Sequence, residues 1–381
     1  MPIALQVLAA VCALLALGGA AYYTLCIWAG LRFLSQQRVS SSFAPPVSIL
    51  KSLKGVDPHM RAAFRSHCLL DYPEYEVLFG VSDLNDPAVA LVKEMQAEFL
   101  QAKLRIVHCP QLLGTNGKVS NLAQILPQAT YEHVLINDSD IVAPRDYLAR
   151  VMARFADPRV GMVTTLYRAI AGKTLGSRLE ALGIATDFMG GVLIAREMEG
   201  MRFALGATMA TTRTVLSAIG GLEGIVDYLG DDYELGARAV MRGYEAVLAD
   251  TVVETALPDY TFRDFWQHQL RWARNNKHLR TEQYFGLVVT FGLIGAIAAV
   301  IAAPQVWWTW VAFAIVAATR LGAAMTIGRG VLDEPNLPGD VWLIPARDFA
   351  ALVVWLWSFA GNTVEWRGMQ YKVKDGKLEK A

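Results

Sequence analysis

The stretch that decides the fold is His133-Val134-Leu135-Ile136-Asn137-Asp138-Ser139-Asp140, an apolar run that ends in two carboxylates. Three similar apolar runs precede it in the chain, at residues 47–50, 76–81 and 104–107. Helical patterns lie between the runs, at residues 60–70, 88–99 and 118–126. Short strands that alternate with helices predict βαβ units. We therefore expect an α/β domain with a mostly parallel central sheet.

Carboxylates follow two of these runs directly. Asp83 ends one run, and Asp138 with Asp140 ends another. Since an open α/β sheet binds ligands at the carboxyl ends of its strands, these side chains fall along the binding edge. An Asp-x-Asp pair offers hard oxygen ligands to Mg²⁺ or Mn²⁺, which neutralises a diphosphate. This edge is therefore the predicted site of a nucleotide and a divalent metal.

The composition favours a membrane-attached protein. Of the 381 residues, 54% are hydrophobic, whereas average apolar usage is roughly 45–50%. Lys and Arg together number 35, as do Asp and Glu, so the bulk charge predicts no nucleic-acid partner. The four cysteines show neither metal-ligand spacing nor a disulfide pattern, which fits a reduced compartment.

The N-terminal part reads as a retained membrane anchor, residues 1–36. Residues 3–33 carry no charged side chain except Arg32, and this length exceeds the roughly 20 residues needed to cross a bilayer. Arg32, Arg38, Lys51 and Lys54 follow the apolar stretch. By the positive-inside rule, we expect the next domain, residues 45–280, to be cytoplasmic.

Three more apolar stretches follow that domain. Residues 284–303 and 305–328 read as two transmembrane helices within 284–328, with Arg320 near enough to the end to snorkel. Residues 341–360 are interrupted by Arg347-Asp348, and the basic residues Arg367, Lys372, Lys374, Lys377 and Lys380 follow. A full crossing would put these lysines outside, so we predict an interfacial or re-entrant segment at 341–361 and a basic cytoplasmic tail at 362–381.

Ordered motifs from residue 45 to 280 resemble the ceramide glucosyltransferase family, a branch of the family 2 glycosyltransferases with a GT-A fold. The first group comprises Leu50-Lys51-Ser52-Leu53-Lys54-Gly55, Asp71-Tyr72-Pro73-Glu74-Tyr75, Asn85-Asp86-Pro87 and Lys118-Val119-Ser120-Asn121-Leu122. A second group is similar to bacterial hopanoid glycosyltransferases: Gly206-Ala207-Thr208-Met209-Ala210, Gly230-Asp231-Asp232-Tyr233-Glu234 and His268-Gln269-Leu270-Arg271-Trp272.

The resemblance implies a role for each matching residue. Asp83 and Lys118 would bind the nucleotide part of a UDP-sugar, while Asp138 and Asp140 would hold the metal at the diphosphate. Asp232 would be the general base, supported by Asp231. Arg271 and Trp272 would close over the diphosphate and acceptor. Many members carry Gln or Arg where this chain has His268, which ranks below Arg271 as a substrate-binding residue.

Each motif also has a purely structural interpretation. Asp83 could cap a turn, Asp138 and Asp140 could lie in a solvated turn, and Asp232 could be a helix N-cap. Arg271-Trp272 could anchor the protein at the membrane surface.

These motifs predict a membrane-bound inverting glycosyltransferase. It would move glucose or N-acetylglucosamine from a UDP-sugar to a lipid hydroxyl, of ceramide or a hopanoid polyol, in glycolipid biosynthesis. We expect a multi-pass protein of the bacterial inner membrane. The alternatives are a processive polysaccharide synthase, which would need more membrane spans, and a catalytically silent membrane scaffold.

Overall fold

The structure, a computed structural model, describes residues 2–36, 39, 41–57, 59–366 and 369–380. Arg38 and Arg367, together with Pro58, lie outside the described residues. The chain forms two compact units, a sheet unit of residues 37–170, 199–258 and 370–381, and a helical unit of residues 1–36, 171–198 and 259–369. Each unit is described by itself.

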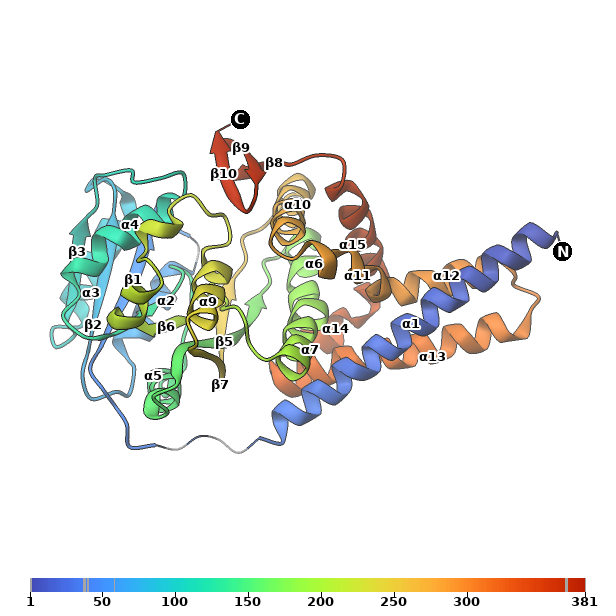
Figure 1. The fold of residues 1–381 in the computed structure, drawn as a ribbon, viewed down its shortest axis with the longest axis horizontal. Coiled ribbons are helices and arrows are strands. Elements are labelled where there is room, and N and C mark those ends of the chain that lie inside the picture. The colour runs from blue at the N-terminus through green and yellow to red at the C-terminus, as the bar shows by residue number, and fades with distance from the viewer. Residues whose placement is uncertain (1, 37–38, 40, 58, 367–368, 381) are drawn as a thin grey trace. The chain divides into compact units, whose positions relative to one another are not determined.

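The sheet unit is built on seven strands: β1 (Val47–Leu53), β2 (Tyr75–Val81), β3 (Leu104–His108), β4 (His133–Ile136), β5 (Val160–Ile170), β6 (Met209–Thr212) and β7 (Glu245–Ala256). Their order is β3-β2-β1-β4-β6-β5-β7 (Figure 1). The strands β3, β2, β1 and β4 run parallel, and so do β5 and β7. Only β6 is antiparallel to its neighbours. The mostly parallel sheet predicted from the sequence is confirmed.

Helices connect the strands: α2 (Met60–Cys68), α3 (Pro87–Glu98), α4 (Gly117–Ile125), α5 (Tyr147–Met152), α8 (Arg213–Ala218) and α9 (Asp231–Met241). The first three confirm the helical patterns at 60–70, 88–99 and 118–126. Asp86 caps α3 by accepting from Ala88 N, and Asn116 caps α4 by accepting from Val119 N. Since α4 follows β3 and ends before β4, its amino end is delivered to the carboxyl edge of the sheet.

The helical unit contains α1 (Ile3–Leu34), α6 (Leu175–Gly183), the π-helix Ile184–Phe188, α7 (Met189–Glu199), α10 (Phe262–Leu279), α11 (Thr281–Gly286), α12 (Gly292–Ala302), α13 (Trp307–Ala324), α14 (Leu337–Asp340) and α15 (Ile344–Ser358). A short strand, β8 (Thr363–Trp366), follows. The units therefore divide the chain differently from the predicted ranges. Residues 171–198 and 259–280 belong with the helices, and 370–380 belong with the sheet.

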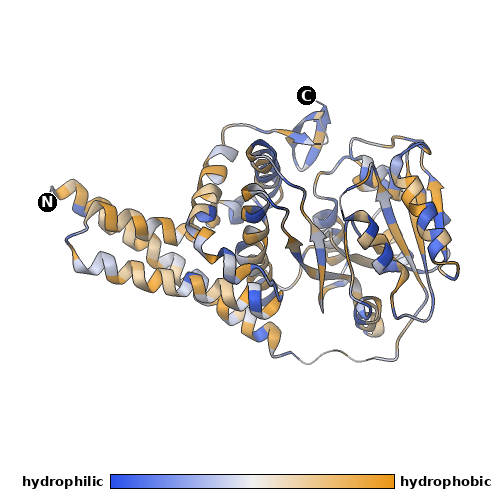
Figure 2. Ribbon diagram, turned by 180° about the vertical axis from the view of Figure 1, so that it is seen from behind, coloured by the Kyte–Doolittle hydropathy of each residue, from blue (hydrophilic) through white to orange (hydrophobic). Residues whose placement is uncertain are grey.

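Within the described part of the chain, four helical segments are long and apolar enough to span a membrane: Ile3–Leu34, Thr281–Ala302, Trp307–Val331 and Leu337–Ser358. Figure 2 shows hydrophobic residues along the helix that carries the N-terminus and along the helices beside it. α1 packs on α12 and α13. A Cβ on Gly19 would lie 2.4 Å from the Cα of Gly292, so the two backbones approach as closely as small residues allow.

Two charged side chains inside these apolar segments, Arg320 and Asp348, pair with each other within the helical unit. Arg320, expected to snorkel to the surface, is instead only 1% exposed. It donates from Nε to Asp348 Oδ2 at 3.0 Å and from Nη2 to Asp187 Oδ1 at 2.9 Å. The snorkelling interpretation is wrong because partners from two other helical segments meet the guanidinium inside the protein. α15, which carries Asp348, packs against α6 and α10, and its interfacial position stays a prediction.

Candidate functional site

The Asp-x-Asp motif follows β4 at the carboxyl edge of the sheet. Lys51, in the middle of β1, is fully buried and donates from Nζ to the backbone oxygen of Asp138 at 2.9 Å. Asp140 accepts a hydrogen bond from Thr255 Oγ1 of β7. Strands on both sides of β4 therefore fix the turn that presents the two carboxylates.

Lys118 joins the motif to the start of α9. Its Nζ lies 2.8 Å from Asp138 Oδ1 and 2.9 Å from Asp231 Oδ2. The Lys118 side chain is 15% exposed, while that of Asp138 is 42% exposed. From the sequence, the Lys118 ammonium was expected beside a phosphate or the nucleobase. In the structure it bridges two carboxylates. One bridge partner, Asp138, remains open to solvent.

Asp232 lies in the first turn of α9 and is held by two backbone donors. Its Oδ2 accepts from Gly206 N at 2.9 Å, and its Oδ1 accepts from Tyr233 N at 2.8 Å. The N-cap of α9 is Gly230, so Asp232 is not the cap. A negative charge here is favoured by the helix dipole, and both oxygens keep lone pairs for a further hydrogen bond.

Gly206 brings the charged groups together by having no side chain. A Cβ at this residue would lie 3.2 Å from Asp138 Oδ2, 3.4 Å from Asp232 Oδ2 and 3.9 Å from Lys118 Nζ. A side chain here would crowd the Asp138 carboxylate and come into contact with that of Asp232. Gly206 is therefore the point on which the metal motif, the candidate base and the lysine converge.

The crowding of carboxylates changes their protonation. Burial and the charge of Asp231 raise the pKa of Asp232 to about 6, against the opposing effect of Lys118. Burial and the charge of Asp138 raise the pKa of Asp140 to about 6. Burial lowers the pKa of Lys51 to about 7, although Asp140 and Asp138 oppose this. Shifted groups of this kind gather at functional sites.

The acidic residues fit a divalent cation that also takes ligands from a substrate. Among the described residues, no group of three or more His, Cys, Asp or Glu is arranged to hold a metal by itself. Asp138 and Asp140 offer carboxylate oxygens, and a bound cation would lower the pKa of Asp140, which burial and the charge of Asp138 raise. Mg²⁺ commonly uses one or two carboxylates together with substrate phosphates.

Asp83 has a local role in the structure. It is exposed, and its Oδ1 accepts from Asn85 N at 2.8 Å and from Asn85 Nδ2 at 3.2 Å. This is the turn-capping geometry considered above. The capping leaves Asp83 Oδ2 for other partners, so nucleotide binding stays a prediction.

His268, Arg271 and Trp272 lie on α10 in the helical unit. His268 Nδ1 is 2.6 Å from Oε1 of Glu180, whose side chain is completely buried in α6. The Trp272 ring lies 5.1 Å from the His268 ring and 5.7 Å from the Phe188 ring, between their centroids. Glu180 therefore lies against His268, whose ring is followed by those of Trp272 and Phe188.

Three contributors were missed from the sequence. Lys51 had a readable signal, a charge next to an apolar run, but it served only for topology and as part of a family-like motif, with no role at the site. Gly206 begins one of the quoted motifs but received no role there, and Glu180 carried no local signal, since their importance depends on neighbours far away in the chain.

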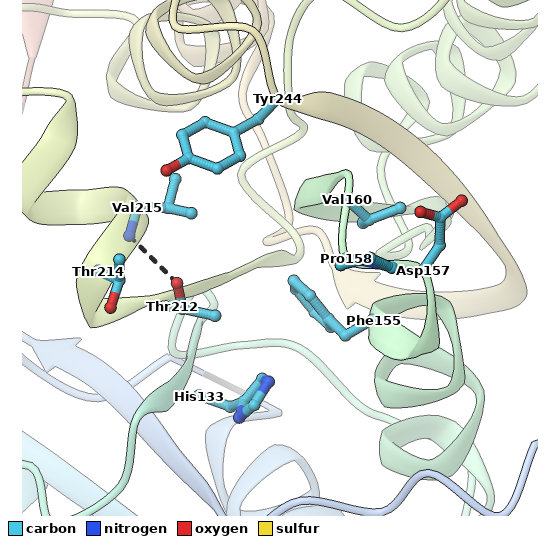
Figure 3. A pocket seen from close by; sticks show the side chains of 9 residues that line it. All are labelled: His133, Phe155, Asp157, Pro158, Val160, Thr212, Thr214, Val215 and Tyr244. Atoms are coloured by element: carbon cyan, nitrogen blue, oxygen red, sulfur yellow. Dashed lines mark hydrogen bonds between the residues drawn. The ribbon is translucent and has the colours of Figure 1, made fainter.

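A separate cavity lies away from these groups. Figure 3 shows its lining, which includes His133, Phe155 and Tyr244. Its volume is about 260 Å³. His133 is the first residue of β4, whereas Asp138 follows the end of that strand. The cavity therefore lies at the opposite end of β4 from the acidic groups and has no part in their chemistry.

Comparison with known proteins identifies the family. The model of glycosyl transferase family 21 matches residues 11–379. The chain belongs to this family. The membership confirms the resemblance to ceramide glucosyltransferases, with family 21 in place of the family 2 branch expected from the motifs.

Relatives of this family 21 member include two proteins of Caenorhabditis elegans. Ceramide glucosyltransferase 1 is 23% identical over 341 residues, covering 87% of this chain and 72% of that protein. Ceramide glucosyltransferase 3 is 22% identical over 234 residues, covering 61% of this chain and 51% of that protein. The chain thus spans about half of the latter's length. Beta-monoglucosyldiacylglycerol synthase of Synechocystis is 24% identical over 241 residues, covering 60% of this chain and 47% of that protein.

A solved structure shows the fold. Mannosyltransferase PcManGT from Pyrobaculum calidifontis, in complex with GDP-Man and Mn²⁺, matches with a TM-score of 0.56 at 20% identity. The match covers 92% of this chain and 99% of that one. The fold of the family 21 chain is therefore of the GT-A type, as predicted, with helices able to span a membrane.

Proposed function

We propose that this family 21 chain is an inverting glycosyltransferase that moves a sugar from a UDP-sugar to a lipid hydroxyl. The observation that carries the proposal is the position of Asp232, a carboxylate with a raised pKa that accepts from Gly206 N, at a residue whose Cβ would also lie 3.2 Å from Asp138 Oδ2. Inverting transfer needs a base on the attacking side and positive charge on the leaving side. Around Gly206, Asp232 would supply the base, and Asp138 and Asp140 would hold the cation that supplies the positive charge.

Asp232 would act as the general base. With a pKa of about 6, it is mostly ionised at pH 7 yet more basic than an ordinary Asp. The Gly206 and Tyr233 N–H groups fix its orientation. As the acceptor hydroxyl attacks the anomeric carbon, its proton passes to the Asp232 carboxylate, and the bond from that carbon to the diphosphate breaks.

The leaving diphosphate would be met by the groups at the end of β4. Asp138 and Asp140 would hold Mg²⁺ or Mn²⁺, which supplies positive charge to the diphosphate when bound. The mannosyltransferase of the same fold was solved with Mn²⁺. Lys118 keeps Asp138 and Asp231 in position, Asp83 would bind the nucleoside, and Arg271, Trp272 and His268 would close the site.

The lipid acceptor is inferred from the helical unit and the relatives. Four segments can span a membrane, and relatives are named for glucosylating ceramide or diacylglycerol. We propose ceramide or a hopanoid polyol as acceptor, entering from the cytoplasmic leaflet of a bacterial inner membrane. Basic residues after the first span favour a cytoplasmic sheet unit.

The test is sugar transfer by the purified full chain. UDP-glucose, UDP-N-acetylglucosamine and GDP-mannose would each be incubated with ceramide, a hopanoid polyol or diacylglycerol, and products identified by mass spectrometry. We expect a glycolipid from a UDP-sugar, formed at least about 10²-fold more slowly by the Asp232→Asn variant. Transfer from GDP-mannose alone, or to diacylglycerol alone, would contradict the proposed donor or acceptor.

Orientation is tested separately by cysteine labelling. Cys12, Cys26, Cys68 and Cys109 would be replaced, and single cysteines introduced at exposed positions of the sheet unit. We expect protection from an impermeant reagent in intact cells. Labelling without permeabilisation would contradict a cytoplasmic sheet unit.

A further inference from the structure

The last part of the chain folds as a β-hairpin. β9 (Met369–Lys374) and β10 (Lys377–Lys380) pair antiparallel, with Leu378 opposite Val373. Asp375 and Gly376 join them with φ of 49° and 76°, the left-handed pair that a two-residue hairpin turn requires and that Asp-Gly favours. Tyr371, Val373 and Leu378 are at most 3% exposed. The predicted tail is therefore ordered, with apolar residues on one face and lysines on the other.

The free edge of β10 pairs with the segment that leads into α9. Leu378 N donates to Asp227 O at 2.7 Å, and Leu229 N donates to Gly376 O at 3.1 Å. Between these bonds, Tyr228 and Lys377 form an antiparallel bridge. Lys377 Nζ lies 5.3 Å from the centre of the Tyr228 ring, a favourable distance for a cation and an aromatic face.

The same segment also holds the amino end of α4. Asn116 N donates to Val226 O at 2.7 Å, and Asn116 Nδ2 donates to Tyr228 O at 2.8 Å. Thr115 N donates to Asp227 Oδ1 at 2.9 Å. Asn116 is the N-cap of α4 and stands two residues before Lys118. Residues 226–230 therefore connect β10 to the helices that carry Lys118, Asp231 and Asp232.

We propose that the C-terminal hairpin positions the catalytic groups: by pairing with residues 227–229, it fixes the start of α9 against the start of α4. Lys377 and Leu378 are positioning residues, since they act through the backbone that leads to Asp231 and Asp232. The catalytic part of this inference rests on the proposed function. The effect of the hairpin on the local opening of residues 226–235 is independent of the proposed function.

The first arm of the test is hydrogen exchange of the full-length protein. Leu378→Pro removes the N–H that donates to Asp227 and the buried side chain. We expect at least about tenfold faster exchange in residues 115–122 and 226–235, with β1 unchanged, because local opening exposes only the paired segment. Lys377→Ala, a milder change, should give about a 2–5-fold effect in the same residues.

The second arm is kinetic. We expect Leu378→Pro to lower kcat by about 10–10²-fold, because a displacement of catalytic groups by about 1 Å has effects of that size. The matched control is Lys372→Ala with Lys374→Ala, which removes two exposed lysines of β9 and leaves β10, the strand that meets Tyr228, unchanged. This control should keep kcat within about twofold.

Three results would overturn the inference. One is unchanged exchange of residues 226–235 in both Leu378→Pro and Lys377→Ala. Another is exchange that rises equally in β1, which would indicate general unfolding. The third is an equal loss of kcat in the lysine control, which would assign the effect to charge. If the wild type transfers no sugar to any lipid, the proposed function fails, and the exchange arm alone decides the role of the hairpin.

Discussion

Replacement of Asp232 by Asn tests the base and its environment together. The amide keeps the size of the side chain but cannot take a proton from an alcohol. Asn also accepts through only one atom, so it keeps one of the two bonds from Gly206 N and Tyr233 N. We expect turnover to fall by about 10²–10⁴-fold, the usual contribution of a general base.

The magnitude of the pH effect follows from the raised pKa. With a pKa of about 6, the ionised share of Asp232 is about 90% at pH 7 and about 10% at pH 5. The wild-type rate should therefore fall by about tenfold between these pH values. An Asp with the ordinary pKa of about 3.9 would lose less than about a tenth of its rate.

Asp231→Asn supplies the matched comparison. The negative charge of Asp231 helps to raise the pKa of Asp232. Removing it should lower that pKa, so the variant should retain a larger share of its pH 7 rate at pH 5 than the wild type does. Because these groups interact, the measured pKa belongs to the cluster.

The assay is the initial rate of glycolipid formation from pH 4.5 to 8, together with UDP-sugar affinity for each variant. A wild-type rate that is flat between pH 5 and 7 would refute the raised pKa as the source of the profile. Near-normal turnover in Asp232→Asn, with loss in Asp231→Asn, would move the base to Asp231. Normal turnover in both would remove the pair from the mechanism.

Three other changes have defined outcomes. Lys118→Met removes the cation that lowers the pKa of Asp232. The acid limb of the pH–rate profile should therefore move toward higher pH, opposite to its movement in Asp231→Asn. An unmoved limb would contradict the electrostatic coupling between Lys118 and Asp232. Excess chelator should abolish transfer, and Asp140→Ala should weaken UDP-sugar binding at least about tenfold in calorimetry with Mn²⁺, whereas full activity in chelator would rule out the metal. Arg320→Ala leaves Asp348 buried without its partner and should lower the free energy of unfolding in detergent by about 3–5 kcal/mol. The control Arg329→Ala removes an ion pair whose Asp333 is 80% exposed and should change this free energy by less than about 1 kcal/mol. Equal effects of the two substitutions would refute the difference that we assign to burial.

The sheet and its helices were predictable because their signals are local. The runs before Asp83 and Asp138 are apolar and β-branched, so each identifies a strand by itself. Short connections then leave few arrangements other than parallel strands with helices between them. Since carboxyl ends of parallel strands share one edge, even the approximate location of the acidic site followed from the sequence.

The apolar helices were predictable for a similar reason, but their charged residues were not. Length and hydropathy identify a segment able to span a membrane. They do not reveal that Arg320 meets Asp348 and Asp187, since those partners lie 28 and 133 residues away along the chain. An isolated charge in an apolar stretch therefore suggested snorkelling, whereas the structure buries it.

The sequence by itself determined the kinds of groups available: two carboxylates after β4, two at the start of α9, and a lysine on α4. Only the tertiary structure decided which groups meet. Lys118 bridges Asp138 and Asp231, and Gly206 admits Asp232 beside them, because loops from four separate strands and helices converge at one edge of the sheet. The basic C-terminal residues likewise became a hairpin paired with Tyr228. Such pairings depend on backbone hydrogen bonds between distant segments, and these bonds leave no periodic signal in the sequence of either segment.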